Sequence, residues 1–382
     1  MNKNLKNDSH PVLRVGIVGG GINSAVGRAH MSALNVDGLF KVVAGSFSRN
    51  HETNLKSGIN FGVDLSRVYA DHTQLIRSEA GNIDVIIVLT PTSSHTSPVM
   101  DALNAGIPVV CEKTLTANID DAVLIRDTEN NKNGFLAVTY NYSGYPAVRE
   151  LKEIVRSGQI GKVLHFAAEM PQEGYLRLNA SGRQLQPQNW RQMDGEVPMI
   201  YLDLGSHLHQ LTSFILGVRP LSVFATEQKY GLYPVIDSVS ALVNYENGVN
   251  GNFIFGKTML GYRNGLKIRI FGTKGALEWT QTDPERIQFA HADGRIELRD
   301  RGYEGLEFSS SRYARFKVGH PAGYVEAFAN LYFDIHAALT QYLKLGTWSS
   351  ENVVGSKFSL DGLKLMLEMH QSALKGCISH LD

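Results

Sequence analysis

Three side chains in this sequence could together move a proton at a hydroxyl-bearing carbon: Lys113, Asp203 and His207. Asp203 and His207 are four residues apart, so a helix beginning near Asp203 would project both from one face toward a common ligand. A structural alternative also fits the pattern, in which Asp203 caps the helix and His207 packs against a sheet. His209 is two residues from His207 and diverges from it on a helix, so we expect no metal.

A glycine-rich turn near the start of the chain predicts a dinucleotide site. The apolar run 12–18 is typical of a buried strand, and 25–34 is predicted to be a helix. Between them, glycines can adopt positive φ and bring backbone N–H groups and the helix N-terminus to a pyrophosphate. Gly27 comes three residues later than the third glycine of the usual fingerprint. The cofactor-binding residues expected in this turn are Gly19, Gly20, Gly21, Ile22 and Asn23.

The strand predicted at 40–48 ends in Ser48 and Arg49, where an NAD-selective site usually carries an acidic residue. A serine can hydrogen-bond a 2′-phosphate and an arginine can pair with it. The cofactor is therefore expected to be NAD or NADP, with a lean toward NADP. Alternatively, Arg49 is a solvated surface residue or stacks on the adenine ring of the cofactor.

Two more predicted strands, 84–89 and 107–111, are followed by residues that could reach a cofactor. Open α/β sheets bind their ligands at the carboxyl ends of the strands. His95 has two interpretations, a nicotinamide-side residue or a surface histidine in a capping turn. The residues expected at the cofactor on this ground are Thr90, Pro91, His95, Glu112 and Lys113.

The order of predicted elements indicates an α/β fold. Strands alternate with helices up to residue 140, which predicts an N-terminal Rossmann domain with a parallel sheet. After a helix at 146–157 strands dominate, which predicts a C-terminal α+β domain with a large, mostly antiparallel open sheet. We expect a flexible tail at 1–11, the Rossmann NAD(P)-binding domain at 12–140, and a substrate-binding and oligomerisation domain at 141–382.

A loop between Tyr175 and Arg191 carries glutamines and arginines and precedes the Asp203 segment. Trp190 could stack on a sugar ring while Arg191 hydrogen-bonds its hydroxyls. The loop could equally form a subunit contact. On the first interpretation, Tyr175, Trp190 and Arg191 bind the substrate.

Composition excludes several classes of protein. The 382 residues carry 37 Lys and Arg against 37 Asp and Glu, and no basic stripe could neutralise the phosphates of a nucleic acid. No apolar run approaches the roughly 20 residues of a membrane span. The polar start, Met1 to His10, lacks the apolar core of a signal peptide, so we expect a cytoplasmic protein. Two cysteines offer no disulfide framework, and Cys111 is interpreted as a core residue.

In its motifs and their order the chain resembles the Gfo/Idh/MocA oxidoreductases over nearly its whole length. In that family the Glu-Lys dipeptide is normally followed by proline. Thr114 takes that place here, so we expect a looser turn after Lys113. The pieces that carry the resemblance are the opening glycine-rich loop, Thr90-Pro91 with His95, Cys111-Glu-Lys-Thr114, Ile160-Gly-Lys-Val163 and Asp203-Leu-Gly-Ser-His207.

The resemblance implies an NAD(P)-dependent dehydrogenase that moves a hydride between the nicotinamide and a hydroxyl-bearing carbon of a sugar or cyclitol. It implies that Lys113, Asp203 and His207 are catalytic and that Asn141 contacts the substrate. Whether His207 or Lys113 takes the proton is left open. The open sheet is expected to pair subunits into a homodimer or homotetramer.

Two alternatives to the dehydrogenase remain. One is a redox-neutral enzyme that uses bound NAD for a transient oxidation during hydrolysis or elimination of a sugar derivative. The other is a catalytically silent, cofactor-sensing regulator on the same fold.

Overall fold

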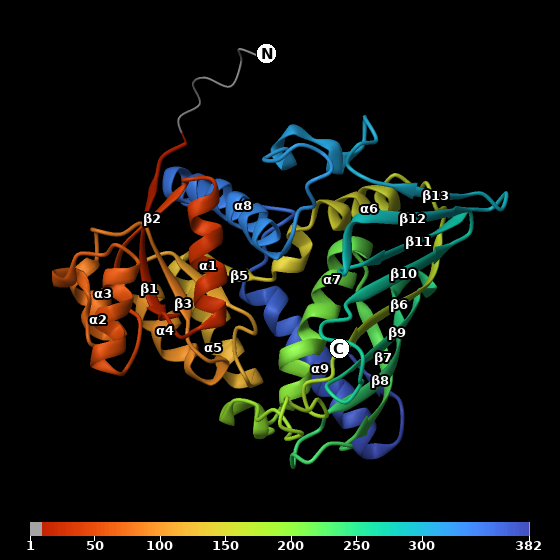
Figure 1. Ribbon diagram of the computed structural model, residues 1–382, viewed down its shortest axis with the longest axis horizontal. Helices are drawn as coiled ribbons and strands as arrows, with labels where there is room; N and C mark the ends of the chain where they lie inside the picture. Colours follow the sequence, from red (N-terminus) through yellow and green to blue (C-terminus); the bar gives the residue numbers. More distant parts are fainter. Residues whose placement is uncertain (1–9, 382) are drawn as a thin grey trace. The chain divides into compact units, whose positions relative to one another are not determined.

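The structure is a computed structural model that describes residues 10–381, and it divides into two compact units, each described by itself (Figure 1). The first unit holds the residues up to Glu112, with Leu124–Thr139 and Phe328–Ser356. The second holds Lys113–Val123, Tyr140–Ala327 and the residues from Lys357 onward. The chain therefore first enters the second unit at the Glu112–Lys113 peptide bond.

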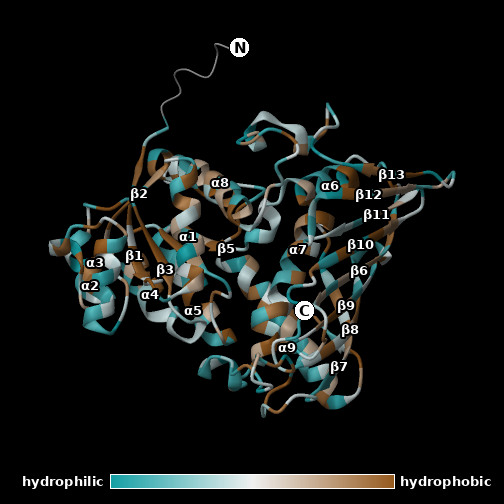
Figure 2. Ribbon diagram, in the orientation of Figure 1, coloured by the Kyte–Doolittle hydropathy of each residue, from teal (hydrophilic) through white to brown (hydrophobic). Residues whose placement is uncertain are grey.

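The first unit is built on a parallel sheet of five strands in the order β2-β1-β3-β4-β5. Every residue of β3 is buried, which explains its continuous run of Val, Ile and Leu and its apolar colour in Figure 2. The order reverses between β1 and β3, which is where doubly wound sheets bind ligands. The strands are β1 Leu13–Gly19, β2 Phe40–Ser46, β3 Val85–Leu89, β4 Val109–Glu112 and β5 Leu136–Thr139.

Helices connect these parallel strands, and one further helix, from far along the chain, packs into the same core. Each of the first three begins at a polar side chain that accepts a backbone N–H of the first turn. The helices are α1 Ala25–Val36, capped by Ser24, α2 His51–Asn60, capped by Asn50, α3 His72–Glu79, capped by Asp71, then α4 Thr96–Asn104, α5 Ile119–Lys132 and, far along the chain, α8 Tyr324–Leu345.

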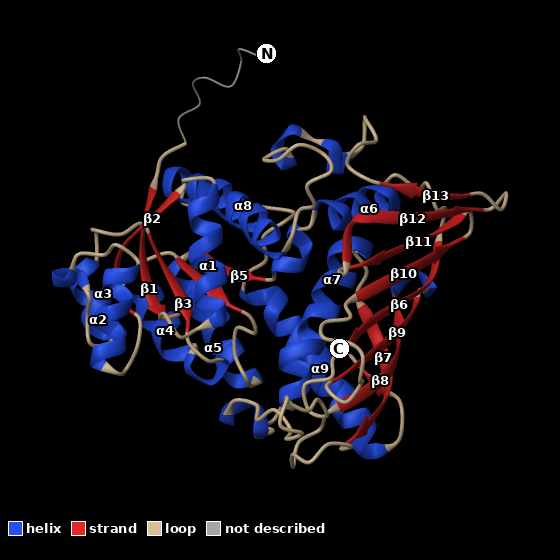
Figure 3. Ribbon diagram, in the orientation of Figure 1, coloured by secondary structure: helices blue, strands red, loops and turns tan. Residues whose placement is uncertain are grey.

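The second unit is built on a nine-stranded sheet in the order β13-β12-β11-β10-β6-β9-β8-β7-β14. Neighbouring strands are antiparallel except β6 and β9, which are parallel (Figure 3). The strands are β6 Val163–Pro171, β7 Pro220–Gln228, β8 Ser238–Tyr245, β9 Asn250–Gly256, β10 Lys267–Gly272, β11 Gly275–Thr280, β12 Asp283–His291, β13 Ile296–Arg299 and β14 Ser379–His380.

The helices α6 Pro146–Arg156, α7 Ser206–Leu216 and α9 Ser356–Lys375 contribute to the core of the second unit together with its strands. In β8 the residues alternate strictly: Val239, Ala241 and Val243 are buried, whereas Leu242 faces outward and is 60% exposed. One face of this sheet is thus covered, and the other keeps exposed apolar residues. Among residues 10–381, no helix is long and apolar enough to cross a membrane.

The expected fold class is confirmed, but the division into units is not one cut at residue 140. Most of α8 belongs to the first unit, because Phe328, Tyr332, Ile335 and Leu339 pack into the core of that unit. A pattern of apolar residues predicts a helix but does not say which core its apolar face joins. Of the tail expected at 1–11, residues 1–9 lie outside the described residues.

We expect Ile335→Ala to destabilise the protein by about 2–5 kcal/mol, because Ile335 is fully buried and truncation leaves a cavity. Leu345→Ala on the same helix is the matched control; Leu345 is 62% exposed, so its truncation should cost no more than about 0.5 kcal/mol. Denaturant unfolding measures both. Equal effects of the two substitutions would contradict the assignment of α8 to this core.

Candidate active site

The glycine-rich loop follows β1 directly and has the backbone that the sequence predicts. Gly19 and Gly20 have φ values of 80° and 66°, the left-handed region that glycine adopts without strain. An added Cβ on Gly20 would lie 2.7 Å from Leu89 Cδ1, and one on Gly21 would lie 2.9 Å from Ser57 Oγ. The loop therefore needs glycine for both conformation and space.

Gly27 supplies the close helix packing that the third glycine of the fingerprint normally provides. A Cβ there would lie 2.0 Å from the carbonyl oxygen of Gly20. Ser24 caps α1 by accepting the N–H of Gly27 at 3.0 Å. The longer spacing is thus accommodated by a turn from Gly21 to Ser24, whose backbone is closed by a 2.8 Å hydrogen bond.

Two polar residues of α2 hold the loops around this turn, and sequence reasoning missed them. Ser57 Oγ accepts the N–H of Ile22 at 3.1 Å. Asn54 Oδ1 accepts the N–H of Phe47 at 2.7 Å and that of Ser48 at 3.3 Å. The sequence carries no signal for this pair, because their burial and the loops that they contact are set by the tertiary structure.

The strand predicted at 40–48 ends earlier, because β2 stops at Ser46, and Ser48 and Arg49 lie in the turn between β2 and α2. The Oγ of Ser48 accepts the N–H of Asn50 at 3.1 Å, and Arg49 is exposed. The Ser48 hydroxyl therefore already stabilises the turn into α2. Asn23 is exposed and Ile22 is partly buried in the loop itself.

His95 is buried, not a surface residue. Its Nε2–H donates to the carbonyl oxygen of Thr90 at 2.7 Å, which stabilises the turn after β3. Pro91 is exposed and Thr90 is partly exposed. Within the first unit, the turn after β3 neighbours the glycine loop, because a Cβ on Gly19 would lie 2.9 Å from the amide nitrogen of Thr90.

Glu112 is bound inside the first unit at the end of β4. Its Oε1 accepts the Thr139 hydroxyl at 2.7 Å and lies 3.3 Å from His30 Nε2. The Nδ1 of His30 lies 2.6 Å from the Tyr332 hydroxyl. This buried chain of polar groups fixes the strand end from which Lys113 departs. The peptide bond between Lys113 and Thr114 is cis.

Taken together, the loop fits a dinucleotide. It joins left-handed glycines, a helix N-terminus capped by Ser24 and the carboxyl ends of β1 and β3 within one unit. Backbone N–H groups of the loop and of the first turn of α1 would hold the pyrophosphate.

In the second unit, Asp203 is the centre of an ion cluster. Lys257 Nζ lies 2.7 Å from Asp203 Oδ2, and Lys113 Nζ lies 3.6 Å from Oδ1. Lys113 also donates to the backbone carbonyl of Asp203 at 2.8 Å. The NH2 group of Arg191 donates to Oδ1 at 3.4 Å, and Arg191 Nε lies 3.3 Å from Oδ2 without hydrogen-bond geometry.

These cations decide the charge of Asp203. Burial alone would raise its pKa, but Lys257, Lys113 and Arg191 outweigh burial and hold the pKa well below its usual range. Asp203 is therefore a carboxylate at neutral pH.

Asp203 does not stand at a helix start, as the sequence pattern suggested. The residues Tyr201–Gly205 form a π-turn that runs directly into α7 at Ser206. Such turns are frequent at functional sites. The turn keeps Asp203 and His207 close enough that the carboxylate acts on the pKa of the imidazole. Asp203 is thus part of the ion cluster and does not cap the helix.

His207 is buried and neutral. Burial and the charge of Lys113 lower its pKa well below the usual value, while Asp203 acts against them. Its Nδ1 is buried without a hydrogen-bond partner, and its ring meets that of Tyr142 edge-on at 4.6 Å. The Tyr142 hydroxyl accepts a hydrogen bond from Asn264 at 3.0 Å. An imidazole in this state can accept a proton from a ligand.

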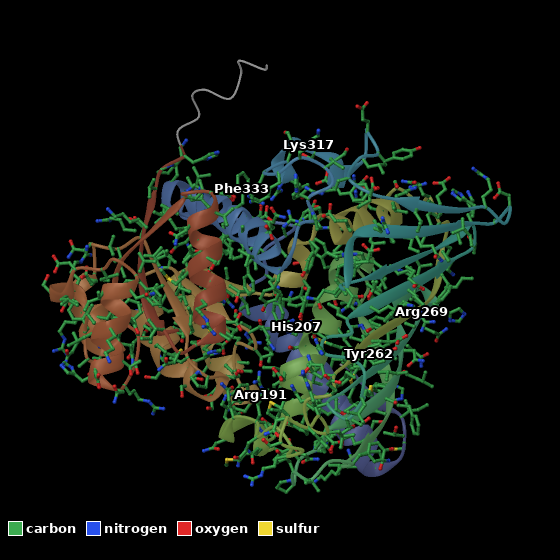
Figure 4. All side chains as sticks on the ribbon, in the orientation of Figure 1. Arg191, His207, Tyr262, Arg269, Lys317 and Phe333 are labelled. Atoms are coloured by element: carbon green, nitrogen blue, oxygen red, sulfur yellow. The ribbon has the colours of Figure 1, made fainter. Side chains whose placement is uncertain are left out.

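The residues expected to bind substrate, Tyr175, Trp190, Arg191 and Asn141, differ in the contacts that their side chains make. Tyr175 is buried and its hydroxyl donates to the carbonyl of Arg191 at 2.7 Å, so it supports that residue. The Arg191 guanidinium lies 4.5 Å from the centre of the Trp190 ring. Figure 4 labels Arg191, on the segment that precedes α7, and His207, on α7 itself. Asn141 is buried, and its Nδ2 has no hydrogen-bond partner.

Lys257 is the site residue that the sequence did not reveal. It directly follows β9, and its Nζ bonds both Asp203 and Gln172 Oε1, the latter at 3.1 Å. A single lysine after a predicted strand carries no distinguishing signal. Within residues 10–381, no group of three or more His, Cys, Asp or Glu side chains could hold a metal ion.

Comparison with known proteins identifies the family. Residues 13–140 match the family described as "Oxidoreductase family, NAD-binding Rossmann fold", and residues 148–278 match the "GFO/IDH/MocA C-terminal domain". The chain belongs to the Gfo/Idh/MocA family of oxidoreductases.

Relatives in this family cover most of the chain at low identity. An uncharacterised oxidoreductase, YfiI of Bacillus subtilis, is 27% identical over 86% of this chain and 85% of its own. The levoglucosan dehydrogenase of Pseudarthrobacter phenanthrenivorans is 25% identical over 75% of this chain and 78% of its own. An inositol dehydrogenase homolog from Azotobacter vinelandii, solved with NADH and myo-inositol, has a TM-score of 0.88 at 26% identity and covers 98% of both chains.

The family match makes this chain an NAD-dependent oxidoreductase. The family description and the Azotobacter structure name NAD or NADH, and neither supports the lean toward NADP drawn from Ser48 and Arg49.

We expect Gly27→Ala to weaken NADH binding at least about tenfold, because the new Cβ must displace the Gly20 carbonyl from the loop. Gly195→Ala is the control, since its Cβ would meet no atom within 4 Å. Fluorescence titration with NADH measures both, beside circular dichroism for folding. Unchanged affinity in a folded Gly27→Ala protein would contradict this role of Gly27.

A second prediction concerns pH. Burial lowers the pKa of His209 from 6.5 to about 4. Between these values the unfolded chain binds the proton and the folded one does not, so stability falls as pH falls. The free energy of unfolding falls by roughly 3 kcal/mol between pH 6.5 and pH 4 on this account. We expect His209→Gln to flatten the decline in free energy of unfolding from pH 6.5 to 4.5, and His165→Gln, at an exposed position, to leave it unchanged. Parallel curves for all three proteins would refute this account of His209.

Proposed function

We propose that this protein is an NAD-dependent dehydrogenase that transfers a hydride between its cofactor and a hydroxyl-bearing carbon of a sugar or cyclitol. The observation that carries the proposal is the direct contact of Lys113 with Asp203, beside a neutral, buried His207. The relatives that share the fold include a levoglucosan dehydrogenase and an inositol dehydrogenase homolog, which supports a polyhydroxylated substrate.

Each residue has a separate task in this proposal. A sugar hydroxyl ionises far above neutral pH, so its oxidation needs a group that accepts the proton as the C=O bond forms. His207 accepts it, because its depressed pKa keeps the imidazole unprotonated. Lys113 donates a hydrogen bond to the same oxygen and stabilises its developing charge. Asp203 and Asn141 orient the neighbouring hydroxyls.

The cofactor we propose is NAD. The family description and the bound NADH of the Azotobacter homolog support it. When bound, the nicotinamide supplies the hydride acceptor for oxidation and the donor for the reverse reaction. A direct comparison of NAD and NADP as cosubstrates tests this choice of cofactor.

We also propose a homodimer or homotetramer. The outer face of the large sheet supports it, because Leu242, Phe271 and Leu298 are exposed there.

Lys113→Ala tests the proposal. We expect kcat to fall by about 10²–10⁴-fold, because the variant loses the donor to the reacting oxygen. Affinity for NADH should change by less than about threefold, since the backbone of the glycine loop holds the cofactor. Absorbance of the reduced nicotinamide, with a panel of inositols, aldoses and sugar acids, gives the rates.

Lys162→Ala is the matched control, because Lys162 is an exposed lysine of the same unit. A near-normal kcat for Lys113→Ala would remove Lys113 from the mechanism. If wild-type protein binds NADH but forms no reduced nicotinamide with any member of the panel, a redox-neutral enzyme or a sensor replaces the dehydrogenase.

A further inference from the structure

The ion cluster around Asp203 carries more positive charge than its one carboxylate can balance. Lys113, Arg191 and Lys257 all lie within 3.6 Å of the carboxylate oxygens. His207 adds no charge, because its pKa is lowered well below neutrality. The four ionised side chains therefore leave two positive charges uncompensated at the site where the substrate is expected.

The next carboxylates lie outside this cluster, and their charges offset the excess only from a distance. Asp194 and Asp237 both lie near Tyr175. Asp194 accepts the backbone N–H groups of Met199 and Ile236 at 3.0 and 2.8 Å. Asp237 accepts those of Tyr230 and Gly231 at 3.1 and 2.6 Å. Backbone amides thus already hold both carboxylates in place.

The two outer cations keep hydrogen-bond donors for a ligand. Lys257 uses two of its three N–H bonds, toward Asp203 and Gln172. Arg191 donates from NH2 to Asp203 Oδ1 at 3.4 Å and from NH1 to Gln188 Oε1, so each of these two groups keeps one further N–H for a ligand, and its buried Nε has no hydrogen-bond acceptor. The Arg191 side chain is 32% exposed, whereas that of Lys257 is only 8% exposed, so an incoming ligand meets the guanidinium first.

Arg191 is also held ready for a ligand. Its guanidinium stacks on Trp190, and its NH1 group donates to Gln188 Oε1 at 3.2 Å. Its backbone carbonyl accepts the hydroxyl of the buried Tyr175. Little side-chain entropy is then lost when the guanidinium binds an anion. Beside it, His207 Nδ1 is a second buried polar atom without a partner in a side chain that is 92% buried.

We propose that the substrate carries an anionic oxygen group, a carboxylate or a phosphate, which Arg191 and Lys257 bind beside Asp203. The inference rests on the proposed function for the sugar or cyclitol ring that bears this group. A neutral polyol could form hydrogen bonds with Lys113, His207 and Asn141, but it would bring no negative charge to balance the excess positive charge of the cluster. A ring with an anionic substituent satisfies both requirements.

Calorimetric titration of NADH-saturated protein tests the inference without requiring turnover. The ligands are matched pairs: glucuronate and glucose, galacturonate and galactose, and each aldose against its 6-phosphate. Saturation with NADH keeps these anions from the pyrophosphate site. We expect a uronate or a 6-phosphate to bind at least about tenfold more tightly than its neutral parent. Comparison of the two series distinguishes carboxylate from phosphate.

Two variants locate the binding group. Arg191→Gln and Lys257→Met should each weaken the anionic ligand at least about tenfold and its neutral parent less than about threefold. Arg183→Gln is the matched control, because Arg183 is an exposed arginine of the same loop. Raising NaCl from about 50 to 300 mM should weaken only the anionic member of each pair, since salt screens charge attraction.

The outcomes separate this inference from the proposed function. Tighter binding of the anionic member without reduced nicotinamide would support the anionic substrate and count against the dehydrogenase. Turnover of a neutral sugar, with its acid and phosphate bound no better, would support the dehydrogenase and overturn the anionic substrate. Binding of no member of any pair would also overturn the inference.

Discussion

The attraction between the buried carboxylate of Asp203 and three surrounding cations organises the candidate active site in the second unit. A lone carboxylate in this position would be protonated, since burial opposes its charge. Lys257, Lys113 and Arg191 keep it ionised, and in return it holds three cationic side chains in one place. Each cation comes from a different segment: Lys257 follows β9, Arg191 lies in the loop before α7, and Lys113 is where the chain enters the second unit. Their contacts with Asp203 bind all three segments to one π-turn.

Lys113 has a special position in this arrangement. It follows Glu112, whose carboxylate is fixed by Thr139 and His30 in the first unit. Its own Nζ is bound to Asp203 in the second. One peptide bond thus separates a residue anchored at the end of the cofactor-binding sheet from a residue anchored in the ion cluster. The chain itself therefore runs directly from the sheet that would hold the nicotinamide dinucleotide to the residue proposed to act on the substrate oxygen.

The same charges also act on the pKa of the buried His207 imidazole. Lys113 disfavours the imidazolium and Asp203 favours it, while burial acts with Lys113. The outcome is a neutral ring with an unpartnered nitrogen next to a positively charged group. A ligand that brought an anionic oxygen would lessen the excess positive charge beside this ring and make protonation of His207 easier. Substrate charge and proton transfer would then be coupled through Asp203 and its cations.

The sequence by itself determined the parallel sheet and the glycine turn, because both depend on local residue type and spacing. The Lys113, Asp203 and His207 set came from the order of motifs that the chain shares with its family. Buried Val and Ile runs specify strands, and only glycine tolerates the backbone of Gly19 and Gly20. Tertiary structure alone decided that α8 joins the first core, that Asp203 sits in a π-turn, and that Lys257 completes the cluster. These features depend on contacts between residues far apart in the chain, and such contacts leave no periodic signal.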